Sequence, residues 1–295
     1  LIEAAKHSGK ASEVNVCWAL CNLLGHRGLP SDEAVKVIVP LITPAFIQTD
    51  SDEVLLNTLR ALTYVTSNED YRQLIESQPV LHKLCHCLTH KNTQIKHSAV
   101  KTLGNLTVTS DTVADEIIST GRLFYLKQSL HSPDKILKDD ILWLLSNISA
   151  GTAAQGAALF KYCMIDSVIE AGMSGELVHL KNACYVIGNL TANASVDQLI
   201  YVVSLGGFRL FARGIQTSGE TLQVSIECMA AYLSAGKSYE ANPFIEALKE
   251  TGAIDALISC ERSDEVRAAQ LAQGILKEYF TEEEICQTMN LIRLD

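Results

Sequence analysis

One apolar segment of eight residues recurs along the chain at a nearly constant interval. It is CWALCNLL at 17–24, and it returns as LRALTYVT, VKTLGNLT, LWLLSNIS, CYVIGNLT and CMAAYLSA, the last at 228–235. Each copy carries one polar residue near its end, and successive copies of that residue are 42, 41, 42, 42 and 43 positions apart. A period of roughly 40–47 residues is typical of helical repeats that stack on one another. The chain is therefore predicted to be an all-α solenoid with one continuous core.

Glycines divide each repeat. Gly121, Gly206 and Gly252 each follow one apolar run and precede another. This predicts a short first helix, a second helix and a long third helix that bears the recurrent segment. Three helices per repeat favour the armadillo class over the two-helix HEAT class, and we expect a right-handed superhelix whose concave face is lined by the third helices.

The fourth copy shows how a third helix divides its faces. Ser132 is expected to cap this helix, with Pro133 as its first residue, and Gly151 is expected to end it. Leu137, Ile141, Leu145 and Ile148 share one helical face and are predicted to be core residues. Asp140, Trp143 and Asn147 share a second face by the same spacing.

Stacking the repeats turns this second face into two rows. The first row is Asn22, Tyr64, Asn105, Asn147, Asn189 and Tyr232; the row one turn earlier is Trp18, Arg60, Lys101, Trp143, Tyr185 and Cys228. An asparagine amide can bond both groups of a passing peptide unit. Aromatic rings between such amides form slots for the stems and cations of Lys and Arg. The alternatives are a solvated helix face at any single position, or structural hydrogen bonding between neighbouring repeats.

Charge favours a basic partner. The 34 acidic and 24 basic residues give a net charge of −10, which repels nucleic acid and attracts cationic proteins. No apolar run is long enough to span a membrane, and the first ten residues lack the apolar core of a leader peptide. The missing initiator Met suggests a chain that starts inside a longer protein. The nine cysteines have no framework spacing, so Cys17, Cys163, Cys184 and Cys228 are interpreted as buried, reduced thiols.

No motif indicates an enzyme, a metal or a cofactor. His82, Cys85, Cys87 and His90 have metal-binding side chains, but on one helix Cys85 and Cys87 point about 200° apart. Buried thiols and solvated histidines are the preferred interpretation there. No Ser/His/Asp or Cys/His arrangement typical of a catalytic site is recognisable in the sequence, so a binding protein is expected.

Two stretches carry a family resemblance. ILWLLSNISAG at 141–151 and the segment 242–280 are similar to the armadillo domain of importin alpha, from about its fourth repeat to its tenth. The resemblance implies an armadillo domain at 1–280, an acidic tail at 281–295, and an adaptor that shuttles between nucleus and cytoplasm. It implies as partners the basic nuclear localisation signals of cargo, importin beta through an N-terminal segment absent here, and an export receptor at the C-terminal repeats and tail.

The resemblance also assigns site residues. It places a second, minor signal-binding cluster at Asn105, Asp140, Trp143, Ser146, Asn147, Tyr185 and Asn189, a last rung of the major cluster at Trp18 and Asn22, and linker contacts at Tyr64 and Lys101. Tyr185 stands where the family has Trp, and Asn182 where it commonly has Glu, which predicts a shallower slot with one carboxylate fewer. Asp140 is one methylene shorter than the usual Glu.

Two other functions stay open. An armadillo scaffold of the adhesion or signalling type would have a strongly basic groove that binds acidic tails. A HEAT-like assembly protein would bury the asparagine row against a partner helix.

Overall fold

A computed structural model describes residues 10–25 and 31–286. The regular elements in these ranges are helices, as the sequence predicts. The chain divides into two compact units, Leu1–Ser129 and Leu130–Asp295, which are described separately.

The first unit is built around three long helices. These are α2 (Lys10–Gly25), α4 (Asp52–Thr66) and α6 (Thr93–Thr107), and each packs against the next. The other elements are α3 (Asp32–Gln48), the 3-10 helix η1 (Glu69–Leu74), α5 (Gln78–Cys87), α7 (Asp111–Ser119) and α8 (Leu123–Leu130), whose last residue crosses into the second unit. The repeats here are not regular, because α3 is a single helix that contains Pro40 and Pro44, and η1 stands before α5 in place of a first α-helix.

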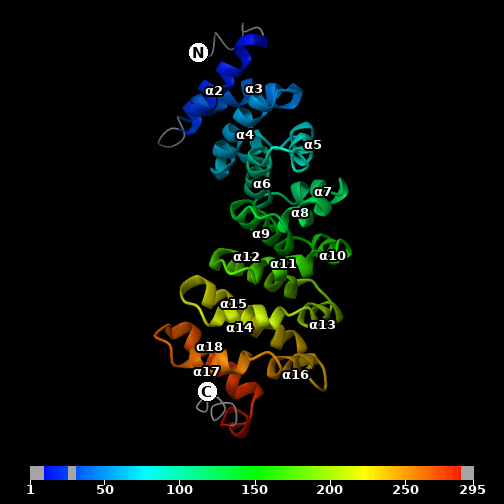
Figure 1. The fold of residues 1–295 in the computed structure, drawn as a ribbon, viewed down its shortest axis with the longest axis vertical. Coiled ribbons are helices and arrows are strands. Elements are labelled where there is room, and N and C mark those ends of the chain that lie inside the picture. The colour runs from blue at the N-terminus through cyan, green and yellow to red at the C-terminus, as the bar shows by residue number, and fades with distance from the viewer. Residues whose placement is uncertain (1–9, 26–30, 287–295) are drawn as a thin grey trace. The chain divides into compact units, whose positions relative to one another are not determined.

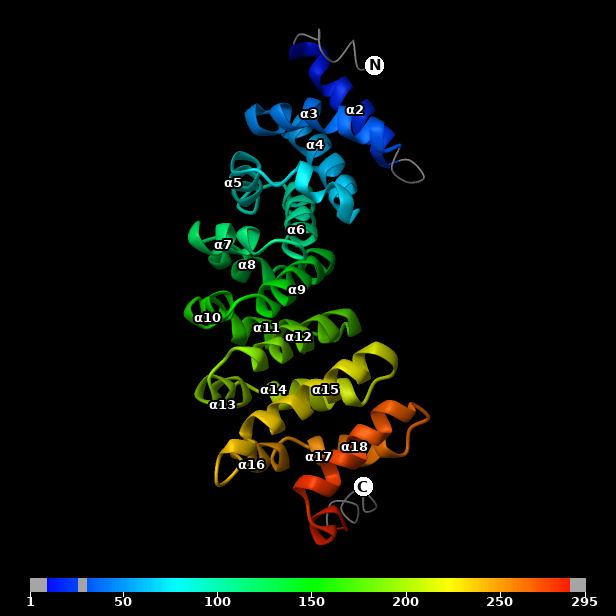
Figure 2. The same cartoon turned by 180° about the vertical axis from the view of Figure 1, so that it is seen from behind.

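The second unit follows the predicted three-helix plan. After the long helix α9 (Lys135–Ala150) come α10 (Ala153–Lys161), α11 (Met164–Gly172) and α12 (Leu177–Asn189); then α13 (Val196–Ser204), α14 (Gly207–Ile215) and α15 (Gly219–Ala235); then α16 (Pro243–Lys249), α17 (Ala253–Glu261) and α18 (Val266–Tyr279). Short 3-10 turns η2 (Leu190–Ala192) and η3 (Gly236–Ser238) extend α12 and α15. The long helices α9, α12, α15 and α18 pack in succession, while α10, α13 and α16 lie along the opposite side (Figures 1 and 2).

The predicted glycine turns are confirmed. Gly121, Gly206 and Gly252 have φ of 69°, 103° and 71°, in the left-handed region that favours glycine. The equivalent turn between α10 and α11 uses Cys163, whose φ is 50°. Cys163 is also exposed, so its assignment as a buried thiol is wrong, whereas Cys17, Cys184 and Cys228 are buried as expected.

The start of α9 differs from the prediction. Asp134, not Ser132, is the N-cap, because its carboxylate accepts hydrogen bonds from the backbone N–H groups of Ile136 and Leu137 at 3.1 and 3.0 Å. Two accepted bonds satisfy two of the N–H groups that the helix start leaves open. Gly151 does follow the last helical residue, but its φ of −78° is not left-handed, so it does not act as the predicted left-handed stop.

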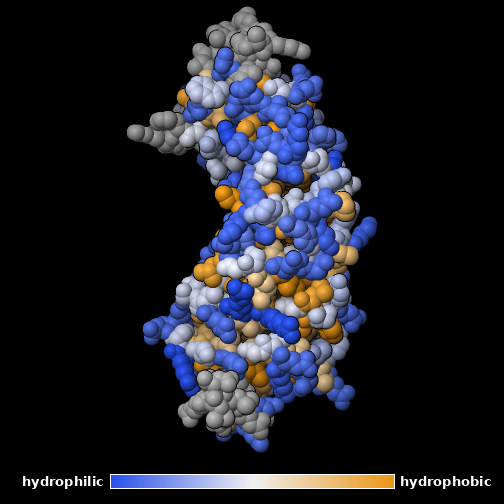
Figure 3. Space-filling view, viewed as in Figure 1, coloured by the Kyte–Doolittle hydropathy of each residue, from blue (hydrophilic) through white to orange (hydrophobic). Residues whose placement is uncertain are grey.

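The predicted core face of α9 is confirmed. Leu137, Ile141, Leu145 and Ile148 are all 2% exposed or less. Hydrophilic residues cover most of the described face seen in Figure 3, with apolar residues in patches among them. No helix of the described residues is both long and apolar enough to cross a membrane.

Candidate functional site

The asparagine row uses its amide nitrogens between repeats. Asn189 Nδ2 on α12 donates to Ser146 O at 3.0 Å and to Ser149 Oγ at 3.4 Å, both near the end of α9. Asn105 Nδ2 on α6 donates in the same way to Thr63 O and Thr66 Oγ1 of α4, at 3.4 and 3.0 Å. The expected alternative of structural bonding between repeats therefore holds at both positions.

This bonding engages the amide nitrogens of Asn105 and Asn189 and leaves their amide oxygens for a ligand. Both N–H groups of Asn105 and of Asn189 are engaged, and both side chains are only half-buried. Neither amide oxygen accepts a hydrogen bond from a described residue. In this arrangement each asparagine can accept from a peptide N–H but cannot also bond the peptide C=O, which corrects the two-group grip expected from the sequence.

The last member of the row is a core residue. Tyr232 on α15 is fully buried, and its hydroxyl donates to Ile187 O of α12 at 3.1 Å. Its ring packs edge-on against Phe208, Phe211 and Phe244, with centroids 5.5 to 5.8 Å apart. Cys228, one turn earlier, is also buried. In the second unit the open part of the two rows therefore ends at α12.

The second unit brings most of the minor-cluster residues onto α9 and α12. Trp143, Asn147, Tyr185 and Asn189 are half-buried. Asp140 and Ser146 are only 6% and 8% exposed, and Ser146 Oγ donates to Trp143 O at 2.7 Å. Trp143 and Tyr185 therefore supply the open ring faces of the site, while Ser146 is turned back onto its own helix.

A carboxylate beside Tyr185 comes from a residue that the sequence analysis missed. Glu220, at the start of α15, accepts from the Tyr185 hydroxyl at 3.1 Å and pairs with Lys181 Nζ at 3.0 Å. These hydrogen bonds, with the Lys181 charge, hold the pKa of Glu220 below its usual value. Burial, followed by the bond to Glu220, raises the pKa of Tyr185.

Asn182 does not face this slot. It is 8% exposed, and its Nδ2 donates to Asp139 Oδ1 on α9 at 2.7 Å. The sequence predicts one carboxylate fewer here because position 182 is Asn, but Glu220, which lies 35 residues after Tyr185, places a carboxylate against the Tyr185 hydroxyl. Only its position at the start of the next third helix could have indicated it.

The first unit gathers another part of the rows around a pocket. Trp18, Asn22 and Tyr64 line a pocket of about 280 Å³ between α2 and α4, together with Cys21, Gly25, Asn57 and Arg60. Trp18 and Tyr64 are 59% and 43% exposed, so both rings are open to a ligand. Lys101 is exposed on α6 and is not among the lining residues.

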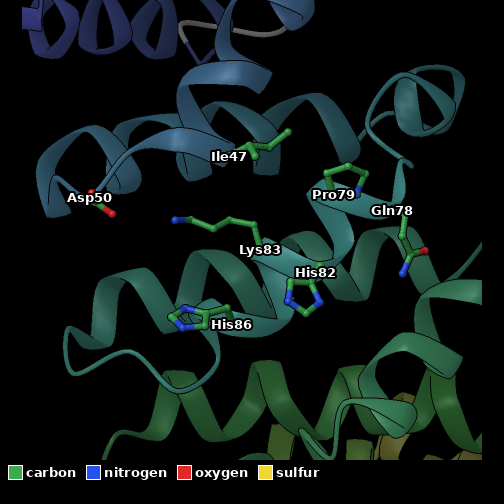
Figure 4. Close-up of a pocket in the computed structure, with 7 residues that line it drawn as sticks. All are labelled: Ile47, Asp50, Gln78, Pro79, His82, Lys83 and His86. Carbon is green, nitrogen blue, oxygen red and sulfur yellow. The ribbon is translucent and has the colours of Figure 1, made fainter.

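A larger pocket of about 620 Å³ lies between the end of α3 and α5. Its lining comprises Ile47, Asp50, Gln78, Pro79, His82, Lys83 and His86 (Figure 4). Several of these polar groups bond within the fold, since Lys83 Nζ donates to Thr49 O at 3.1 Å and Gln78 Nε2 to Glu116 Oε2 at 2.8 Å. Burial, then the charges of Arg122 and Lys83, lowers the pKa of His86.

The cysteines beside this pocket are buried thiols. Burial raises the pKa of Cys85 to about 12 and that of Cys87 to about 11. His82, by contrast, is largely exposed. Among the described residues, no group of three or more His, Cys, Asp or Glu side chains is arranged so that it could hold a metal ion.

Solved structures with a similar fold are armadillo-repeat proteins. A designed armadillo repeat protein aligns with a TM-score of 0.71 at 20% identity, over 81% of this chain and 98% of its own. A second one, described as in complex with the peptide (KR)4, aligns with a TM-score of 0.71 at 18% identity, over 82% and 99%. The chain has the armadillo-repeat fold.

The sequence relatives of this armadillo chain are importin alpha subunits. Importin subunit alpha-4 of Arabidopsis thaliana is 27% identical over 292 residues, which cover 92% of this chain and 52% of the relative. Importin subunit alpha-1a of Oryza sativa subsp. japonica is 28% identical over 182 residues, or 61% of this chain and 32% of the relative. No model of a protein family matches the chain. The armadillo chain spans about half the length of these relatives or less.

Proposed function

We propose that the chain is part of a nuclear import adaptor that holds a Lys/Arg-rich nuclear localisation signal in extended form across the long helices. The observation that carries the proposal is the slot on α9 and α12, where Trp143 and Tyr185 present half-buried rings at the same position of successive repeats. Ring faces of this kind attract the cationic ends of Lys and Arg and pack against their aliphatic stems.

The repeat spacing suits an extended peptide. Packed helices lie about 8–10 Å apart, and an extended chain advances about 3.3–3.6 Å per residue. One repeat therefore corresponds to about two to three residues of an extended peptide. Asn189, with its nitrogen fixed to α9, offers its oxygen to a peptide N–H at the outer end of the slot. Glu220 adds a carboxylate beside Tyr185 that a peptide cation can share with Lys181.

Similarity to known proteins also supports this proposal. The sequence relatives are importin alpha subunits, and a neighbour in fold is a designed armadillo protein bound to the peptide (KR)4. On the same similarity we propose that the protein shuttles between nucleus and cytoplasm. We also propose that it binds importin beta through another part of the protein and an export receptor through its C-terminal repeats.

The competing function is a scaffold that binds acidic tails. It is favoured by the basic residues Arg60 and Lys101, which are both exposed at the ring position of α4 and α6.

A comparison of peptides separates the two functions. The probe is a Lys/Arg-rich peptide that directs a reporter protein into nuclei, and its matched control is a single-residue variant that does not. Calorimetric titration should give tighter binding of the active peptide than of the control, and weaker binding of a Glu-rich peptide of equal length. Equal affinity for the active and inactive peptides would refute an import adaptor, and preference for the Glu-rich peptide would favour the scaffold.

A further inference from the structure

The pocket between α2 and α4 differs in charge from the slot on α9 and α12. We propose that it takes the carboxylate side chain of an Asp or Glu residue in the bound peptide. The inference rests on the proposed function, since it assumes that an extended peptide follows the long helices. It adds a selectivity for an acidic residue at one defined point of that peptide.

Arg60 is the charged group of this pocket. The other lining residues are Trp18, Cys21, Asn22, Gly25, Asn57 and Tyr64, which are neutral at pH 7. The guanidinium of Arg60 is exposed, and its Nη2 donates a long hydrogen bond of 3.4 Å to Gln94 Oε1. An ion pair between Arg60 and a carboxylate is not found among the described residues. The pocket therefore presents a positive charge that the fold does not neutralise.

Asn57 points to the same ligand chemistry. It lines the pocket, and its side-chain amide forms no hydrogen bond with the described residues. Because the amide is reached from the pocket, a ligand that accepts from its N–H groups forms a hydrogen bond that the fold does not already supply. Asn57 lies three residues before Arg60 on α4, so both side chains share one face of the helix. An amide N–H and a guanidinium are both donors, and a carboxylate accepts from both.

The equivalent residues on α9 favour a ligand of the opposite charge. Asp140 and Trp143 occupy on α9 the positions that Asn57 and Arg60 occupy on α4. An acid and a ring favour a cation, whereas an amide and a guanidinium favour an anion. Arg is suited to this role because its planar fork can bond both oxygens of a carboxylate.

The size of the pocket suits one side chain. Its volume of about 280 Å³ lies below the range of roughly 300–1,000 Å³ that is typical of small-molecule sites. The exposed rings of Trp18 and Tyr64 form part of its lining, and they can hold the methylene groups of a Glu stem.

The test is a set of labelled peptides. Each carries a Lys-Arg-Lys-Arg cluster, a Gly/Ser spacer of graded length on either side, and one guest residue that is Glu, Gln or Lys. Fluorescence anisotropy gives the affinity of each peptide for the intact chain and for three variants. Arg60→Gln removes the guanidinium, Asn57→Asp with Arg60→Trp copies the α9 pattern, and Lys36→Gln removes an exposed charge on α3 of the same unit as a control.

At the best spacer, we expect the Glu peptide to bind the unchanged chain about 3- to 5-fold more tightly than the Gln peptide, which is the range of an exposed charge pair. Arg60→Gln should abolish this preference, Lys36→Gln should keep it, and the double variant should prefer Lys. A Glu preference that survives Arg60→Gln, or a Lys preference in the unchanged chain, overturns the inference and leaves the proposed function standing.

A further titration tests the pocket in the case that the proposed function is wrong. If the Lys/Arg cluster binds nowhere, a peptide of four Glu residues without the cluster is titrated instead. Binding that Arg60→Gln weakens supports the pocket on its own, and no binding overturns it.

Discussion

The turn between the first and second helices of a repeat needs a residue with positive φ. Glycine meets this need at Gly121, Gly206 and Gly252, but the turn between α10 and α11 places Cys163 at a φ of 50°. A side chain with a Cβ in the left-handed region costs about 1–2 kcal/mol. The second unit therefore keeps a strained residue at a position where its neighbours use glycine.

Replacing Cys163 by glycine should relieve this strain. We expect Cys163→Gly to raise the free energy of unfolding by about 0.5–1 kcal/mol, because the relief exceeds the entropy that glycine loses on folding. Urea unfolding measures the change. Cys163→Ala is the matched control, since it removes the thiol but keeps the Cβ, and it should bring no such gain. Equal gains in both variants would locate the effect in the thiol and contradict the prediction.

Asn182 gives a second test at the same scale. Changing Asn182 to Glu replaces a buried donor to Asp139 by a second carboxylate. The lost hydrogen bond and the repulsion between two carboxylates should lower the free energy of unfolding by about 1–3 kcal/mol. Adding Asp139→Asn to this variant should recover much of the loss, as thermal and urea unfolding would show. Equal stability of Asn182→Glu and the unchanged chain would contradict the contact with Asp139.

At the scale of elements, the sequence predicted the period, the all-α class and the core face of α9, because these depend on local spacing. It placed the start of α9 two residues early, since Ser132 and Asp134 are both good caps and only their contacts distinguish them. It did not predict that Tyr232 is a core residue, because the rings around it come from α14 and α16. Glu220 was missed for the same reason, as it belongs to the following repeat.

The segment after α18 is tied to α16 by a titratable contact. Residues 282–286 are helical, Thr281 donates from its backbone N–H and its hydroxyl to Glu284 Oε2 at 2.8 and 3.0 Å, and Lys249 Nζ lies 2.9 Å from Glu284 Oε1. The bonds from Thr281, then the one from Lys249, lower the pKa of Glu284 from 4.5 to about 2.

The pH dependence of this contact follows from the direction of the shift. A depressed carboxyl pKa contributes stability that is present above pH 4.5 and is lost as the pH falls through about 2. Carbon NMR of the Glu284 carboxyl should show titration near that value, and Lys249→Met should raise it. Lys277→Met, which removes an exposed charge on α18, should leave it unchanged. Titration of Glu284 at its ordinary pKa in the unchanged chain would contradict the contact.

At the scale of the whole molecule, a net charge of −10 favours basic ligands, but charge is distributed unevenly over the repeats. The ring position carries Trp18, Arg60 and Lys101 in the first unit, and Trp143, Tyr185 and the buried Cys228 in the second. The armadillo fold thus repeats one backbone arrangement, while the side chain at the ring position differs in charge and type from one repeat to the next. A basic signal is accordingly assigned to the slot on α9 and α12 rather than to the whole row.

The most direct test of this account is a titration of one Lys/Arg-rich nuclear localisation peptide into the unchanged chain and into the double variant Trp143→Ala/Asn147→Ala. If ring contacts hold the peptide cations, loss of the ring alone costs about 1–2 kcal/mol. The account therefore predicts at least a 5-fold loss of affinity in the double variant, with circular dichroism unchanged. Equal affinity of the two proteins for the peptide would contradict it.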